Sequence, residues 1–93
     1  MIIGTAEVKI YAPWVGSLKE KRMIVKSLIA KTRNKFNVSI AEIAEQDIHQ
    51  VIVLGIVCVA GSVSHSDSIM DKVIGLIDNS TEAEIIEINR EIR

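Results

Sequence analysis

Hydrophobic and polar residues alternate along the first strand-length segment of the chain. From Ile2 to Tyr11, every even-numbered position is aliphatic or glycine, whereas most odd-numbered positions are polar. A period of two places alternate side chains on opposite faces of a β-strand. The segment is therefore predicted to be a half-buried strand, and Pro13 and Gly16 predict a loop after it.

The period of the pattern changes to that of a helix from Ser17 to Phe36. Ser17 and Glu20 have the spacing of a capping box, in which the Ser17 hydroxyl accepts from the Glu20 N–H and the Glu20 carboxylate binds the Ser17 N–H. At about 100° per residue, one sector of this helix forms the predicted core stripe. Its members are Leu18, Val25, Ile29, Thr32 and Phe36, with Leu28 beside them.

The remainder of the chain is predicted to contain three strands and one helix. Val38–Ala44 is a second strand, and Gln50–Ala60 is apolar on both faces, which is typical of a central strand. A turn at Gly61–Ser64 precedes a helix over Ser66–Asn79. Ala83–Ile92 alternates again and is predicted to be the last strand.

The element order β-α-β-β-α-β predicts an α+β, ferredoxin-like sandwich made of one domain, residues 1–93. Two right-handed crossovers give an antiparallel sheet of strand order 4-1-3-2 with both helices on one face. Ile3, Ile43 and Ile85 are expected on the uncovered face with some third-strand residues. Such a patch commonly marks association. We therefore expect a homo-oligomer, a dimer formed sheet to sheet or edge to edge.

Positive charge is concentrated in the predicted first helix. Ser17–Phe36 holds seven bases and one acid, 7 − 1 = +6, whereas the chain after Phe36 holds three bases and ten acids, 3 − 10 = −7. A helix polarised in this way suggests a docking surface for an anionic partner. The candidate RNA- or anion-binding residues are Lys19, Lys21, Arg22, Lys26, Lys31, Arg33 and Lys35.

These bases are expected to form two rows along the helix. Lys19, Arg22, Lys26 and Arg33 fall at one border of the apolar stripe, and Lys21, Lys31 and Lys35 at the other. Two such rows are suited to binding a phosphate backbone. The alternative is that the long basic side chains extend along the edge of the buried stripe and only keep the helix soluble. With only 3% aromatic residues, any RNA is expected to be recognised by backbone and shape.

A protein-interaction module without RNA binding is the alternative interpretation. The domain is predicted to have one basic and one acidic helix, which suits a charged protein partner or a second copy. Trp14, the large aromatic residue of the first loop, is a candidate partner contact. The alternative, equally weighted, is that Trp14 covers one end of the hydrophobic core.

No constellation in the sequence indicates catalysis. His49 lies beside Asp47, but no nucleophile is near them in sequence, and Asp67 and Asp71 are expected to face solvent rather than hold a cation. Cys58 stands alone in an apolar run that is half as long as the roughly 20 residues of a membrane span. We therefore expect a non-enzymatic, cytoplasmic protein with no cofactor, metal, membrane segment or small-molecule substrate.

The sequence resembles the YlxP-like proteins, a small bacterial family catalogued as a domain of unknown function. The resemblance rests on Ser17-Leu18-Lys19-Glu20-Lys21-Arg22, Val25-Lys26-Ser27-Leu28, Arg33-Asn34-Lys35-Phe36-Asn37-Val38-Ser39, Ala41-Glu42, Gln46-Asp47 with Gln50, and Met70-Asp71-Lys72-Val73-Ile74. It implies a ferredoxin-like fold. Members are encoded in many bacteria beside translation-initiation and ribosome-maturation genes, which implies the ribosome or its RNA as partner. The family has no established catalytic residues, so none is transferred here.

Overall fold

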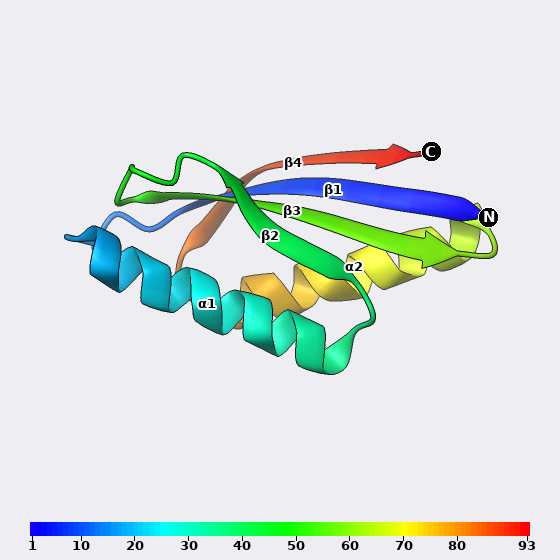
Figure 1. Cartoon of the computed structure of the whole chain (residues 1–93), viewed down its shortest axis with the longest axis horizontal. Coiled ribbons are helices and arrows are strands. Elements are labelled where there is room, and N and C mark those ends of the chain that lie inside the picture. The colour runs from blue at the N-terminus through cyan, green and yellow to red at the C-terminus, as the bar shows by residue number, and fades with distance from the viewer.

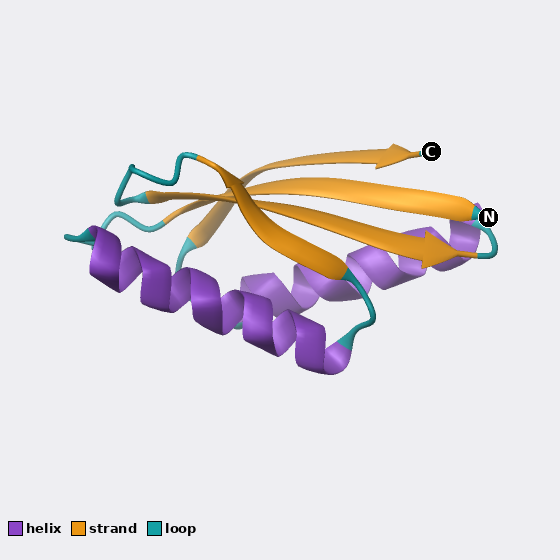
Figure 2. Ribbon diagram, in the orientation of Figure 1, coloured by secondary structure: helices purple, strands orange, loops and turns teal.

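Two helices cover one face of a four-stranded antiparallel sheet, and the other face of the sheet is open (Figures 1 and 2). The computed structural model describes all 93 residues. The strand order β2-β3-β1-β4 confirms the predicted ferredoxin-like sandwich. The elements are β1 (Ile2–Tyr11), α1 (Leu18–Lys35), β2 (Ser39–Ala44), β3 (Val51–Ala60), α2 (Val63–Asn79) and β4 (Glu84–Ile92).

The core lies between the helices and the two central strands. β1 pairs with β3 along its whole length, from Ile2 opposite Ala60 to Tyr11 opposite Val51. The even-numbered residues of both strands lie on the side of the helices, and all of them except Ile2 are buried, as the alternation in β1 predicted. The two faces of β3 also differ in burial, although the sequence of β3 is apolar on both faces. Burial of these aliphatic side chains is the main favourable term in folding.

The buried stripe of α1 is rotated from the predicted one. Its buried residues are Lys21, Val25, Leu28 and Thr32, whereas Leu18, Ile29 and Phe36 are only half-buried. At 100° per residue the centre of the stripe moves by about 40° toward Leu28. Thr32 is accommodated because its hydroxyl donates to the Leu28 carbonyl at 2.8 Å.

Serine residues cap the N-termini of both helices. The Ser17 hydroxyl accepts from the Glu20 N–H at 3.1 Å as predicted, but the Glu20 carboxylate accepts from the Gly16 N–H rather than that of Ser17. Ser62 caps α2, which therefore begins at Val63, three residues before the predicted start. A serine that satisfies a free N–H typically stabilises a helix by about 1 kcal/mol.

The open face of the sheet is apolar over β2 and β3. Ile43 lies over Gly55, where an added Cβ would meet the Ile43 side chain at 2.9 Å. Val57 and Val59 are exposed beside them. The expectation that Ile85 also lies on this face is wrong, because Ile85 is half-buried and packs against the core.

Gly4 lies on β1 close to Ser66 of α2, and its replacement by alanine should lower stability. An added Cβ would lie 2.1 Å from the Oγ of buried Ser66 and 3.0 Å from the Sγ of Cys58. Gly4→Ala should therefore lower the free energy of unfolding by about 1–3 kcal/mol, measured by urea denaturation.

The matched variant is Gly4→Ala with Ser66→Ala, which removes the closest clashing oxygen. It should recover part of the lost stability, because the Ser66 Cβ contact of 3.5 Å is an ordinary one and only the Cys58 Sγ contact of 3.0 Å remains tight. Parental stability in the single variant, or no recovery in the double variant, would contradict this account of the packing.

Candidate nucleic-acid interface

The outward side of α1 carries most of the exposed positive charge of the protein. The helix buries Val25, Leu28 and Thr32 against the sheet, so its other faces are directed to solvent. None of its exposed bases takes part in an ion pair. These residues are Lys19, Arg22, Lys26, Lys31, Arg33 and Lys35.

Four of these bases form one continuous row, which we call the basic flank: Lys19, Arg22, Lys26 and Arg33. Their spacings of three, four and seven residues keep them on one side of the helix. With a rise of about 1.5 Å per residue, the row is about 21 Å long. The Arg33 guanidinium donates to the Ile40 carbonyl at 3.2 Å, so the basic flank faces the β2 edge of the sheet.

Lys21 is not part of an exposed basic surface, and its prediction as an anion-binding residue is wrong. It is only 1% exposed, and its ammonium lies 3.0 Å from the Glu42 Oε2 and donates to the Glu45 carbonyl. That carboxylate oxygen has no other polar partner, so the contact is an ion pair without aligned hydrogen-bond geometry. Without Lys21, six exposed bases and Glu20 give α1 a charge of 6 − 1 = +5.

The Lys21 contacts fix α1 to the end of β2. Glu45, the residue after this strand, has φ 58°, in the left-handed region that non-glycine residues seldom adopt. The Lys21 ammonium binds the carbonyl of this residue and the side chain of Glu42 together. A buried charge with two such partners is structural, because moving it toward an external phosphate would break both contacts.

Two of the three acidic residues of α2 are engaged with β4. Arg90 lies 2.7 Å from the Asp71 carboxylate and 3.5 Å from that of Asp67. Asp67 and Asp71 are exposed, as expected, but this arginine had not been predicted as their partner. No three His, Cys, Asp or Glu side chains come together in the geometry of a metal site.

Trp14 is held at the N-terminal end of α1 by a well-anchored loop. Its neighbours Ala12 and Val15 are buried, and both are bound to Gln50, through the Ala12 N–H at 2.7 Å and the Val15 carbonyl at 2.9 Å. The indole itself is 49% exposed. The loop thus presents half of the ring to solvent, and both roles considered for Trp14 remain predictions.

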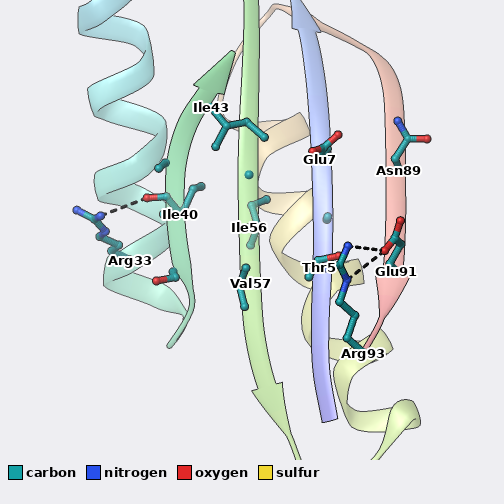
Figure 3. A pocket seen from close by; sticks show the side chains of 14 residues that line it. Thr5, Glu7, Arg33, Ile40, Ile43, Ile56, Val57, Asn89, Glu91 and Arg93 are labelled. Carbon is teal, nitrogen blue, oxygen red and sulfur yellow. Dashed lines mark hydrogen bonds and ion pairs between the residues drawn. The ribbon is translucent and has the colours of Figure 1, made fainter.

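The open face of the sheet contains a shallow hollow of about 580 Å³ (Figure 3). Arg33 reaches one end of it from α1, and Arg93 lies at the other end, where it pairs with Glu91 at 2.8 Å. Glu7 also lines the hollow. Two carboxylates here disfavour a polyanion, so the open face is a poorer phosphate surface than the basic flank.

The sequence profile described as "Protein of unknown function (DUF503)" matches residues 3–90. The chain belongs to the DUF503 family. The uncharacterized protein YlxP of Bacillus subtilis (strain 168) is 40% identical over 83 residues, covering 89% of this chain and 90% of that protein. This confirms the resemblance that the helix motifs indicated.

One solved structure supports the fold of this DUF503 chain. A de novo designed protein with ferredoxin fold, determined by solution NMR, superposes with a TM-score of 0.64. The alignment covers 100% of this chain and 86% of the design, at 22% identity. The likeness concerns the fold alone.

None of the helices is long and apolar enough to cross a membrane.

The sequence contained a signal for the Lys21 contact that helix-wheel reasoning missed. Lys21 precedes Val25, Leu28 and Thr32 by four, seven and eleven residues, which is the spacing of a single buried stripe. The contact between Arg33 and the Ile40 carbonyl could not be predicted from the sequence, because every residue has a backbone carbonyl that can accept such a hydrogen bond.

Proposed function

We propose that this protein is a non-catalytic accessory factor that binds structured ribosomal RNA through the basic flank of α1. The observation that carries the proposal is the row of four exposed bases, none of which has a carboxylate partner. Its relationship to the YlxP-like proteins, encoded in many bacteria beside translation genes, supports RNA of the ribosome as the ligand.

The physical driving force is the exchange of counterions for protein charges. Phosphates that contact Lys or Arg release condensed cations, so affinity falls steeply as salt is added. Elsewhere in the protein, Arg90 and Arg93 are neutralised by aspartate and glutamate. The basic flank is therefore the surface best suited to several phosphates at once.

The distribution of charge also fixes the orientation of the protein on RNA. Glu84, Glu87 and Glu91 lie on β4, at the sheet edge opposite β2 and α1 (Figure 1). These acids repel a polyanion, which confines contact to the α1 side. With few aromatic residues available for stacking, recognition depends on the shape and backbone of the RNA.

The direct test is fluorescence anisotropy of labelled structured ribosomal RNA fragments over a series of salt concentrations. Four phosphate contacts predict a slope of log K against log salt between about −2.8 and −3.6. A slope near zero, or no binding at low salt, would overturn the proposal.

A matched pair of variants locates the contact on one side of the helix. Arg22→Ala with Lys26→Ala removes two charges from the basic flank, whereas Lys31→Ala with Lys35→Ala removes two exposed charges outside it. The first should reduce the magnitude of the salt slope by about 1.4–1.8, and the second should change it little. Equal losses in the two variants would show that binding follows total charge rather than this flank.

A protein-interaction role without RNA is the second candidate, favoured by the half-exposed Trp14. Such a site should retain its protein partner in the presence of excess RNA, and it should lose affinity when Trp14 is replaced by alanine. Loss of the protein partner to competing RNA would instead favour the basic flank.

A further inference from the structure

The two edges of the sheet differ in how well they are protected. β2 has only six residues and a register irregularity between Glu42 and Ala44, and the Arg33 guanidinium covers the Ile40 carbonyl. β4 has nine residues, its register irregularity lies at one end, between Ile85 and Glu87, and no element of the chain pairs with its outer side. Short strands, irregularities and covering side chains deter edge pairing, so β4 is the edge open to association.

The backbone groups of β4 that point away from the sheet belong to Ile88, Arg90 and Ile92. Arg93 exchanges two hydrogen bonds with Ile3, at 2.7 and 2.9 Å, so its N–H and C=O face β1. In a regular antiparallel ladder this direction alternates along the strand. The register is unbroken from Arg93 back to Glu87, so the backbone N–H and C=O groups of the even-numbered residues point away from β1.

The same three residues form an exposed strip on the helix-covered side of β4. Ile88 and Ile92 lie opposite Val8 and Gly4, whose side of the sheet faces the helices. They remain 42% and 43% exposed, because α2 packs mainly on β1 and β3. Arg90, between them, is bound to the two aspartates of α2.

We propose that β4 pairs antiparallel with β4 of a second copy, about a two-fold axis at Arg90. The outward N–H and C=O groups of each strand then bond to those of the other. Ile88 faces Ile92 of the second copy, and Arg90 faces its equivalent. The result is one continuous eight-stranded sheet, four strands from each copy, with all helices on the same face.

Charge complementarity selects this register over its neighbours. On the open side of the sheet, pairing at Arg90 places Glu87 opposite Arg93 of the second copy. Centring the axis on Asn89 would instead place Glu87 opposite Glu91, and centring it on Glu91 would oppose two copies of that glutamate. Like charges directly opposite one another destabilise a strand pair. The two arginines at the axis are tolerated because each contacts two carboxylates.

This self-complementarity favours a second copy over a foreign strand. A foreign peptide would satisfy the backbone groups of β4 equally well. The strand itself, however, carries both members of the opposite-charge pair and both isoleucines at matching distances from Arg90. An isologous two-fold interface requires this relationship, in which each residue meets its counterpart reciprocally.

The first test is sedimentation equilibrium of the whole chain over a wide concentration range, with Ile92→Pro as the variant. Proline removes an outward N–H but no hydrogen bond of the β1 ladder, so the monomer should keep its fold. The parent should show a monomer–dimer equilibrium, and Ile92→Pro should be monomeric. A parent that stays monomeric at every concentration would overturn the proposal.

A charge swap tests the register without altering the backbone. Arg93→Glu should weaken the dimer about tenfold, because two symmetric attractive pairs become repulsive. Adding Glu87→Arg restores opposite charges across the axis and should restore the parental dissociation constant. Loss without recovery in the double variant would exclude this register.

Disulfide trapping provides a second readout of the register. Residues that face one another in a hydrogen-bonded antiparallel pair have Cα atoms about 5.5 Å apart, within the range that a disulfide spans. Arg90→Cys should therefore form a covalent dimer under oxidation, while buried Cys58 stays unreactive. Asn89→Cys is the control, since it faces itself only in the shifted register. Efficient trapping at Asn89 alone would contradict the proposed axis, and neither result depends on RNA binding.

Discussion

Replacing Glu42 with leucine should lower the free energy of unfolding by about 3 kcal/mol, since it leaves the Lys21 ammonium buried without its carboxylate partner. Only the Glu45 carbonyl would remain to stabilise the charge. The side chain of Glu42 is itself 17% exposed, so the opposite single change, Lys21→Met, should cost less. Urea denaturation followed by circular dichroism measures both variants.

The double variant Lys21→Met with Glu42→Leu separates the charge effect from packing. Replacing a buried ion pair by apolar residues of similar size is often neutral or stabilising, so this protein should regain most of the stability of the parent. Lys19→Met is the matched control on an exposed position of the same helix, and it should change stability by less than about 0.5 kcal/mol. If Glu42→Leu were as stable as the parent, the Lys21 contact would have no structural role.

Reversing the charge of Lys19, Arg22 and Lys26 to glutamate should abolish RNA binding while the fold is retained. Lys19 lies in the first turn of α1, where the helix dipole favours an acidic residue, and Arg22 and Lys26 are exposed and outside every ion pair, so the fold should not weaken. Arg33 is left unchanged because it also binds the Ile40 carbonyl. We expect an affinity at least a hundredfold lower in anisotropy titrations at about 0.1 M salt.

The control for this variant has the same net charge but an intact flank. Lys31→Glu, Lys35→Glu and Lys72→Glu also shift the protein by six charge units while they keep Lys19, Arg22 and Lys26. This control should bind RNA within several-fold of the parent. Binding lost to the same degree in both proteins would indicate a general electrostatic attraction instead of a docking surface.

The fold could be predicted from the sequence because the hydrophobic pattern and the capping residues of the elements indicate the same arrangement. The alternation of β1, the capping serine of α1 and the apolar run of β3 all point to the same arrangement. α2 began earlier than predicted because Ser62, and not a later serine, caps it. Where one turn contains several serines, the sequence alone does not show which of them caps the helix, because the packing of the helix decides it.

The candidate site was predicted only in part because charge alone does not determine burial. Six of the seven bases on α1 are exposed as expected, but Lys21 lies in the middle of the buried stripe. A long basic side chain is normally assigned to the solvent side, and only a carboxylate from another element makes the opposite placement stable. Glu42 supplies it from β2, a contact that requires the three-dimensional arrangement.

The contact between Arg33 and the Ile40 carbonyl has a consequence for the entropy of binding. A free lysine or arginine loses rotamer freedom when it settles on a phosphate, which costs up to about 2 kcal/mol per side chain. Arg33 has already lost part of that freedom, because one of its five donors is fixed to β2 while the rest of its planar group stays available. Lys19 and Lys26 have no such anchor. The basic flank therefore has one preorganised end, from which a ribose–phosphate chain would engage the flexible lysines in turn.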